Sequence, residues 1–430
     1  MTDNDIPLAK GPDEIPTPGP VRESKTTKVV IALLGAGLLF GPWAAYATGA
    51  RSQPVPGENR VLAARPQIDG FQTFQQITQY AADHFPLRDA AIRSNKALIE
   101  EMFGEDPSYF ASADSLQVLS GEQGWLYLYD DFNEACKPKL QLATVLAGVQ
   151  RLQRMLAASG RRLVVTMPAD KSTADPQFLP KSFALQSCTN TARDQRWKAL
   201  RALHLPGWVD MRQEVADLEQ RTGKPAYLPY DTHWGQDAQA VFATAMARAL
   251  DPALLKGTRT TVGPAYVEHG DLESLLGIVR DHRFSAVFVQ RAGVKVTRKD
   301  EELGPVPGAY TVSHFTATTT GPAALFQPRT TWIGDSFTQR ALESGTLQYF
   351  FRDMVRVPEL TKAVLASGSH PEVYQAARSR MISEIVKSRV TVLELVERTF
   401  MGAAGYGSMW DPKTHFLDDL QAALDAPPKG

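Results

Sequence analysis

Two short segments contain the three residue types that catalyse acyl transfer at a serine. Residues 331–338 read TWIGDSFT, an apolar strand that ends in glycine and is followed by Ser336 at the expected start of a helix. Residues 230–234 read YDTHW, in which Asp231 and His233 point the same way if the chain is extended. Ser336 would then be the nucleophile, His233 its base, and Asp231 the group that orients the imidazole.

Each segment also has an interpretation without chemistry. Asp335 or Ser336 could simply cap the following helix, and Asp231 could help to cap a helix that begins near Gly235, with His233 packed beside it. Taken singly the segments are weak evidence, but together they supply one nucleophile, one base and one orienting carboxylate. A serine after a buried strand would lie at the carboxyl edge of a parallel sheet, where its backbone N–H can help to hold an oxyanion.

The elements expected around these segments alternate between helices and buried strands, which indicates an α/β fold. Residues 163–167, LVVTM, form an apolar run typical of a strand buried on both faces, after a helix that Gly160 should end. Residues 260–325 are less regular, and we expect short antiparallel strands there. The other expected elements are two helices within 71–103, a hairpin at 116–128, helices near 140–159, 191–203, 212–222, 236–250 and 416–424, and strands at 208–210, 330–333 and 390–396.

The N-terminal residues indicate export. Residues 1–28 are rich in proline and charge and should be disordered. Residues 29–48 carry no charge and are long enough to span a bilayer core of about 30 Å, with Lys25 and Lys28 before them to keep the N-terminus cytoplasmic. We expect a single-pass signal anchor in the cytoplasmic membrane; a signal peptide cleaved at 45–47, AYA, is the alternative. Either way the rest of the chain lies on the periplasmic or extracellular side.

Composition argues against several other classes of protein. The 46 basic and 47 acidic residues leave a net charge of −1 with no basic run, which does not suit nucleic-acid binding. Cys136 and Cys188 lack zinc-ligand spacing, and either a disulfide or two separate thiols would fit an exported protein. We expect no metal, because no cysteine or histidine has metal-ligand spacing. We also expect no cofactor, because there is no phosphate loop or dinucleotide fingerprint. Four histidines also lack metal-ligand spacing and are interpreted as structural or surface residues: His84, His269, His282 and His314.

The paired blocks DTHW at 231–234 and GDSF at 334–337 resemble the SGNH-hydrolase-like domain of the alginate O-acetyltransferases of the AlgJ/AlgX type. This resemblance implies a three-layer α/β/α sandwich. It also implies a permuted order, since ordinary SGNH esterases place the serine block first, and one triad geometry can arise from different chain orders. The likeness covers roughly residues 70–400 and extends to the segments 121–127 (GEQGWLY), 167–171 (MPADK) and 270–272 (GDL).

Carried over to this chain, the resemblance implies Ser336 as nucleophile, His233 as base and Asp231 as orienter of an O-acetyltransferase acting on an extracytoplasmic polysaccharide. Acetyl-CoA is cytoplasmic, so it also implies a multi-pass membrane O-acyltransferase as the partner that supplies acyl groups. A carbohydrate acetylesterase of the same fold and a non-catalytic envelope scaffold are the alternatives.

Three further residues are candidates for substrate contacts: Lys171, Trp234 and Arg340. Each also has a structural interpretation, since Lys171 could form a solvated charge pair with Asp170, Trp234 could be a core residue, and Arg340 could face only solvent. The expected division of the chain is a disordered cytoplasmic lead (1–28), a transmembrane anchor (29–48), a linker (49–68), an SGNH-like acyltransferase domain (69–410), and a C-terminal helix and tail (411–430).

Overall fold

The computed structural model describes residues 118–426, with gaps at 277, 305–309, 361–362, 364–370 and 402–407, and a few isolated positions before residue 81. The expected lead, anchor and linker, and the two helices within 71–103, therefore lie almost wholly outside the described residues. Among the helices that the structure describes, none has the length and apolar character needed to cross a membrane.

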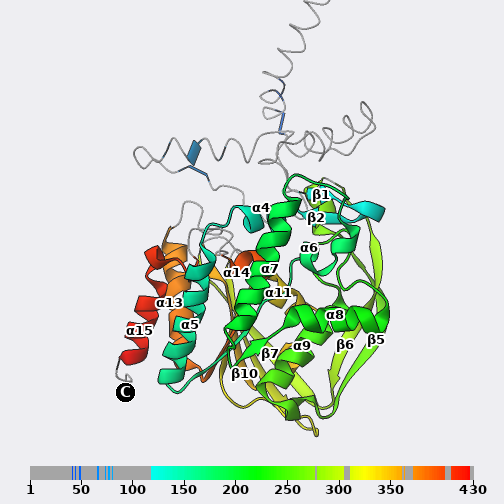
Figure 1. The fold of residues 1–430 in the computed structure, drawn as a ribbon. Helices are drawn as coiled ribbons and strands as arrows, with labels where there is room; N and C mark the ends of the chain where they lie inside the picture. Colours follow the sequence, from blue (N-terminus) through cyan, green and yellow to red (C-terminus); the bar gives the residue numbers. More distant parts are fainter. Residues whose placement is uncertain are drawn as a thin grey trace, which may run out of the picture.

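A mixed sheet of seven strands forms the centre of the fold (Figure 1). Its order is β4–β3–β11–β9–β10–β8–β7, in which the first five strands are parallel and the last two pair antiparallel. This confirms the expected α/β fold. The strands are β3 (Arg162–Thr166), β4 (Trp208–Val209), β7 (Val294–Glu302), β8 (Thr311–Thr319), β9 (Thr330–Gly334), β10 (Asp353–Pro358) and β11 (Val390–Glu394).

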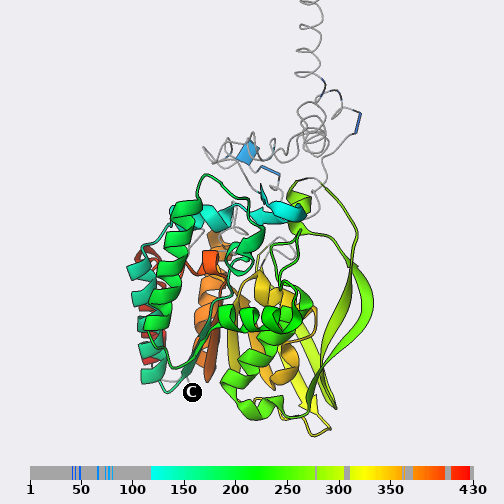
Figure 2. The ribbon, with the colours of Figure 1, turned by 45° about the vertical axis from the view of Figure 1, so that its right-hand side comes forward.

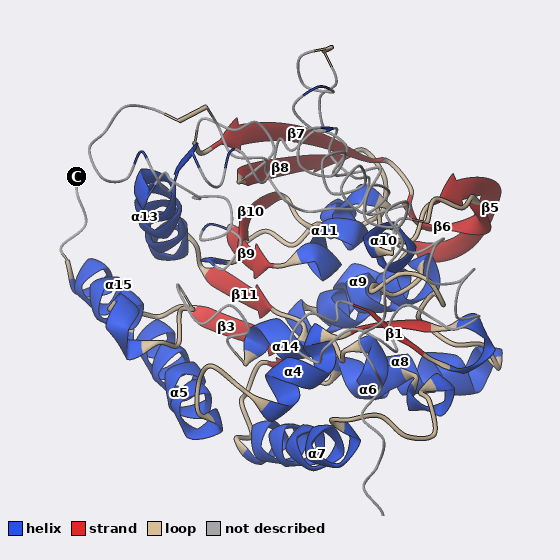
Figure 3. Ribbon diagram, turned by 90° about the horizontal axis from the view of Figure 1, so that it is seen from above, coloured by secondary structure: helices blue, strands red, loops and turns tan. Residues whose placement is uncertain are grey.

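Helices cover both faces of the parallel part of this sheet (Figure 3). Successive residues of a strand point to opposite faces. Accordingly, Val164 and Trp332 pack into one apolar core, whereas Val165 and Ile333 pack into the other. The first core is completed by α8 (Met211–Thr222), α9 (Gln236–Leu250) and α11 (Ser336–Glu343), and the second by α5 (Leu142–Ala158), α7 (Gln186–Ala202), α13 (Pro371–Lys387) and α15 (Phe416–Asp425).

The antiparallel strands expected between 260 and 325 are present, but they are longer than expected. Strands β5 (Thr258–Glu268) and β6 (His282–Arg291) are 11 and 10 residues long and form a separate two-stranded ribbon at one side of the molecule (Figure 2). The short helix α10 (Asp271–Leu275) lies between them in the chain. Strands β7 and β8 have nine residues each and extend the main sheet. The ribbon and α10 reach the site described below.

The hairpin expected before residue 128 is present as β1 (Val118–Ser120) and β2 (Leu126–Leu128). Helix α4 (Asp130–Cys136) follows it, and a disulfide joins Cys136 to Cys188 of α7. Of the two alternatives left open for the cysteines, the structure therefore contains the bridge. Two short helices, α6 (Lys171–Ala174) and α14 (Glu397–Phe400), follow β3 and β11 respectively at the end of the sheet where the site lies.

Candidate active site

The candidate nucleophile begins helix α11 directly after β9. Asp335 caps this helix, because its Oδ1 accepts a hydrogen bond from the Phe337 N–H at 2.9 Å. The second oxygen of Asp335 accepts from the Val396 N–H at 2.7 Å and so ties the cap to the segment after β11. The capping interpretation thus applies to Asp335. Ser336 is left partly exposed in the first turn of the helix.

Buried polar groups pack against the junction between β9 and α11. A Cβ atom at Gly334 would lie 2.4 Å from Thr338 Oγ1 and 3.0 Å from Glu394 Oε2, so the close approach requires glycine. Thr338 donates a hydrogen bond to Glu394, whose pKa is raised well above its ordinary value by burial and by the charge of Asp335. Arg356 donates to the carbonyls of Gly334 and Asp335 at 3.4 and 3.3 Å. The junction of strand and helix is therefore rigid.

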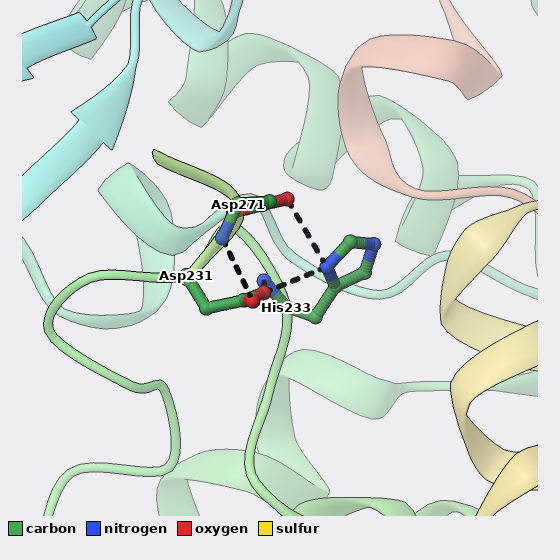
Figure 4. A group of neighbouring side chains, drawn as sticks. All are labelled: Asp231, His233 and Asp271. Carbon is green, nitrogen blue, oxygen red and sulfur yellow. Dashed lines mark hydrogen bonds and ion pairs between the residues drawn. The ribbon is translucent and has the colours of Figure 1, made fainter. Parts of the chain in front are cut away.

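Asp231 holds the imidazole of His233 in one orientation (Figure 4). Its Oδ1 accepts from the His233 backbone N–H at 2.8 Å and lies 2.8 Å from Nδ1 of the same residue. The other ring nitrogen, Nε2, is buried and makes no hydrogen bond. In Figure 4 this nitrogen points away from the carboxylates. An imidazole bound by a carboxylate at Nδ1 and free at Nε2 has the arrangement of a general base.

A second carboxylate, Asp271 of α10, joins this pair, although the sequence analysis assigned it no role. Its oxygens accept from the backbone N–H of Thr232 at 2.7 Å and from the Thr232 hydroxyl, and Oδ2 lies 3.4 Å from His233 Nδ1. Its own N–H donates to Asp231 Oδ2 at 3.3 Å. Gly270 permits this approach, since a Cβ there would lie 2.2 Å from the carbonyl oxygen that precedes Asp231. The match of residues 270–272 to the family pattern was the available signal.

The charges around the imidazole favour its protonated form. Burial lowers the pKa of His233, but the charges of Asp231 and Asp271 and the hydrogen bond to Asp231 outweigh it, so the pKa is raised above 6.5. Arg340 opposes this rise. Burial raises the pKa of Asp231, yet the nearby His233 and Arg340 lower it to about 2. Asp231 is therefore ionised at neutral pH and can stabilise the imidazolium formed during catalysis.

Helix α11 packs directly against this histidine–aspartate group. The ring centroids of Phe337 and His233 are 5.1 Å apart, and Arg340 donates to Asp231 Oδ2 at 3.3 Å. Ser336 lies four residues before Arg340 and therefore on the same side of the helix. The two segments, about a hundred positions apart in the chain, thus meet at one place. His233 Nε2 and the Ser336 hydroxyl make no hydrogen bond to each other; many enzymes form this bond only with substrate present.

The three candidate substrate contacts have different environments. Lys171 and Asp170 are not a solvated charge pair: both are buried, Asp170 pairs with Arg398 at 2.6 Å, and Lys171 binds backbone carbonyls. Trp234 is 1% exposed and packs into the first core, so its ring is not open to a sugar. Arg340, with a side chain 29% exposed, contacts Asp231 and borders solvent. Of the three, Arg340 has the position expected of a substrate contact.

The ligand atoms of Asp231, His233 and Asp271 lie within 4.8 Å of one another, a spacing that could suit a metal ion. Hydrogen bonds to one another and to Thr232 already occupy these atoms in the structure. The group is therefore complete as a hydrogen-bonded unit. Of the four histidines interpreted above as structural or surface residues, His84 lies outside the described residues. The other three each pair with a carboxylate: His269 with Asp281, His282 with Glu273, and His314 with Asp353.

Comparison with known families matches residues 118–341 to the model ALGX, described as the SGNH hydrolase-like domain of the acetyltransferase AlgX. This match spans more than half of the 430 residues. It contains Asp231, His233, Asp271 and Ser336. Comparison with curated proteins gives no match.

Several solved structures are similar to the chain. The O-acetyltransferase domain of Pseudomonas putida AlgJ is 18% identical, with a TM-score of 0.46 over 71% of this chain and 99% of that one. Pseudomonas aeruginosa AlgX is 12% identical, with a TM-score of 0.45 over 75% and 70% of the two chains. Bacillus cereus PatB1 with a sulfonyl adduct is 11% identical, with a TM-score of 0.42 over 68% and 97%.

Proposed function

The chain belongs to the ALGX family of SGNH hydrolase-like acetyltransferase domains, and we propose that it transfers acetyl groups to hydroxyls of an extracytoplasmic polysaccharide through an acyl-serine intermediate. In this proposal Ser336 is the nucleophile, His233 the general acid and base, and Asp231 the residue that orients it. One observation carries the assignment. His233 is bound at Nδ1 by Asp231 and unbound at Nε2, beside the helix that begins with Ser336.

The proposed reaction has two acyl transfers. In the first, Ser336 Oγ attacks the carbonyl carbon of the acetyl donor while His233 Nε2 takes the hydroxyl proton. The imidazolium then gives this proton to the leaving group as the donor bond breaks, and acetyl-Ser336 remains. In the second, a sugar hydroxyl loses its proton to Nε2 and attacks the acyl carbon, which forms the sugar ester. The proton returns to Ser336 Oγ, and the enzyme is regenerated.

Two features of the site support stabilisation of the charges that arise in these steps. The backbone N–H of Ser336 lies in the first turn of α11, where the helix dipole favours an oxyanion. Asp231 and Asp271 both lie close to Nδ1 and stabilise the imidazolium by their negative charge. Arg340 neutralises part of this negative charge and, at the border with solvent, is our candidate for a contact to the acceptor.

We further propose that the catalytic domain lies on the periplasmic or extracellular side, held by a membrane helix at residues 29–48. The disulfide Cys136–Cys188 supports this location, because disulfides persist mainly in oxidising compartments. Acetyl-CoA is confined to the cytoplasm, so the acetyl group needs a carrier across the membrane. A multi-pass membrane O-acyltransferase is the proposed donor partner, and loss of acetylation on its deletion would be the corresponding observation in cells.

The test uses the purified protein and a Ser336→Ala variant. Each is incubated with p-nitrophenyl acetate, with and without a polysaccharide-derived oligosaccharide, and the products are analysed by mass spectrometry. We expect acetyl-Ser336 and acetylated oligosaccharide from the wild type, and neither from the variant. Release of free acetate alone, at a rate that the oligosaccharide does not change, would identify an acetylesterase. A wild type that neither hydrolyses the ester nor reacts with a fluorophosphonate probe would be a non-catalytic scaffold.

A further inference from the structure

Lys171 is a fully buried cation bound by backbone carbonyls. Its side chain is 0% exposed. The ammonium Nζ donates to the carbonyl oxygens of Leu228 at 2.6 Å, Pro229 at 2.8 Å and Asp231 at 3.1 Å. An ammonium has three N–H groups and no acceptor, so these three bonds use its whole donor capacity. No oxygen of a substrate is needed to satisfy it.

The three carbonyls belong to the loop that leads into the histidine–aspartate group. Residues 228–231 form no helix or strand, so the polar groups of this loop depend on other partners. The Leu126 N–H donates to the Pro229 carbonyl at 2.8 Å, and a single bridge between Tyr227 and Trp234 closes the base of the loop. Lys171 binds three carbonyls of this loop at one point. One of its partners is the Asp231 carbonyl itself.

Aromatic rings enclose the ammonium. Nζ lies 4.8 Å from the centre of the Trp125 ring and 5.4 Å from that of Tyr127, both on the β1–β2 hairpin, and Trp125 stacks on Phe178 at 4.1 Å. Such rings attract a cation and exclude water. Burial lowers the Lys171 pKa to about 7, although nearby carboxylates, Asp231 first among them, act to raise it. The carbonyls, rings and carboxylates around Nζ therefore offset only part of the cost of burying its charge.

We propose that Lys171 is a positioning residue of the acyl-transfer site, which sets the place of Asp231 and, through Asp231, the orientation of the His233 imidazole. It lies in the core and does not contact the reacting atoms. This role replaces the substrate contact expected from the sequence. The catalytic meaning of this role rests on the proposed function. The geometry of the Asp231–His233 pair, however, can be measured without acetyl transfer.

Arg291 offers a matched control. It is also a buried cation, 5% exposed, and donates to the carbonyls of Tyr349, Leu254 and Ala324 at 2.8, 2.8 and 2.6 Å. Its guanidinium likewise lies over an aromatic ring, that of Phe350, at 4.4 Å. It ends β6, whereas the other end of this strand, roughly 30 Å away at 3.3 Å per residue, is the one that reaches the site. Loss of Arg291 therefore removes comparable contacts far from the histidine.

The experiment compares wild type, Lys171→Met, Lys171→Gln and Arg291→Met in the full chain. Two quantities are measured: the rate at which a fluorophosphonate probe labels Ser336, and the downfield proton resonance of the His233 Nδ1–H bound to Asp231. We expect both Lys171 variants to label about 100-fold more slowly, because small displacements of a catalytic base have effects of this size. They should also lose the downfield resonance. Arg291→Met should label within about two-fold of wild type and keep the resonance, since distant sites act independently.

Folded Lys171 variants that label at the wild-type rate and keep the resonance would overturn the proposal. Failure of both Lys171 variants to fold, while Arg291→Met folds, would also contradict it, since Lys171 would then be a residue of general stability. The proposed function is tested separately. A wild type that is labelled but transfers no acetyl group would refute the transferase alone, and the resonance would still report whether Lys171 sets the histidine.

Discussion

Two carboxylates act on the imidazole of His233 from the same side, and they differ in strength. Asp231 has a side chain 2% exposed and lies 2.8 Å from Nδ1, whereas that of Asp271 is 20% exposed and lies at 3.4 Å. Electrostatic interactions and hydrogen bonds weaken with distance and with contact to solvent. Asp231 should therefore determine the tautomer of the His233 ring, and Asp271 should mainly raise the pKa of that ring.

Replacing these carboxylates by amides separates the two roles. Asp231→Asn should reduce the rate of Ser336 acylation by about 10⁴-fold, because an amide can hold the wrong tautomer and does not stabilise the imidazolium. Asp271→Asn should cost about 10-fold or less, as expected for a partly exposed charge. The measurement is the burst rate with p-nitrophenyl acetate for the folded variants. Equal losses in the two variants would show that the carboxylates share one role.

The pH dependence of acylation follows from the raised pKa of His233. The neutral imidazole is the base, so the rate should increase with pH and reach half of its maximum above pH 6.5. Asp271→Asn removes a charge that raises this pKa and should move the midpoint to lower pH, whereas Arg340→Gln removes a charge that lowers it and should move the midpoint to higher pH. The pH profile of kcat/KM measures both, and shifts of the same sign in the two variants would contradict this account.

The same raised pKa affects stability with a definite sign. A histidine whose pKa is higher in the folded state stabilises the fold most at low pH, below its unfolded value of 6.5. This contribution of His233 is lost as the pH rises through the folded pKa. The stabilisation from Asp231 is complete above its unfolded pKa of 3.8 and is lost as the pH falls to about 2, so it does not change in the neutral range.

The residues of this site differ in how far their roles can be predicted from the sequence. Asp231 and His233 are two positions apart, so their mutual geometry follows from an extended chain. Asp271 lies 40 positions from Asp231 and reaches it because α10 folds back, a contact that no local pattern encodes. Lys171 looks like a surface residue by type, and its burial depends on carbonyls of a loop nearly 60 positions away. Residues that act through long-range contacts were therefore missed or assigned another role.

At the scale of elements, the junction of β9 and α11 controls how the nucleophile is presented. Gly334→Ala would place a methyl group 2.4 Å from Thr338 Oγ1, against a buried network that includes Glu394. We expect a loss of about 1–3 kcal/mol in the free energy of unfolding from overpacking, together with a marked loss of Ser336 labelling. Urea denaturation and fluorophosphonate labelling measure the two effects.

Gly235 provides the control for this junction. It lies two positions after His233 and caps α9, but its added Cβ would meet its nearest atom at 3.4 Å, an ordinary contact. Gly235→Ala should therefore cost about 1 kcal/mol or less, the usual effect at a helix cap, and leave labelling unchanged. If Gly334→Ala behaved in the same way, the tight junction would have no part in presenting the serine.

The ribbon of β5 and β6 shows how an element remote in sequence completes the site. A two-stranded ribbon is marginally stable alone. Here its inner end is held to the site by the Glu268–Arg340 ion pair at 2.7 Å and by the stacking of His282 on Tyr230, with ring centroids 3.4 Å apart. These contacts place α10, and with it Asp271, beside the histidine. The ribbon therefore helps to position Asp271 in the active site.

Elements were predictable where burial imposed a simple pattern. The apolar runs at β3, β9 and β11 identify strands because both of their faces are covered. Strand β10 was missed because Arg356 interrupts its apolar run. This arginine is buried in the structure, where it donates hydrogen bonds to the carbonyls of Gly334 and Asp335. Strand β7 was missed because it lies at the edge of the sheet, where its mostly exposed charged residues show no clear alternation.

At the scale of the whole molecule, the disulfide closes a large loop that contains part of the site. Cys136 and Cys188 are 52 positions apart, and β3 and Lys171 lie between them. The sequence alone did not decide whether these cysteines form a disulfide. Pairing depends on a Cα separation, here 5.5 Å, that arises only when α4 packs on α7. Closing such a loop restricts the unfolded chain more than it restricts the folded one.

Replacing both cysteines by alanine should therefore lower the free energy of unfolding by about 2–4 kcal/mol, the entropy of a loop of this length, while leaving the folded site intact. The site should persist because Asp131 of α4 and Asp170 remain paired with Arg398 at 3.1 and 2.6 Å, and β3 remains paired with β11. Urea denaturation measures the loss, and reductant should destabilise the wild type but not the double variant. Slower Ser336 labelling by the folded double variant would show instead that the bridge shapes the active site.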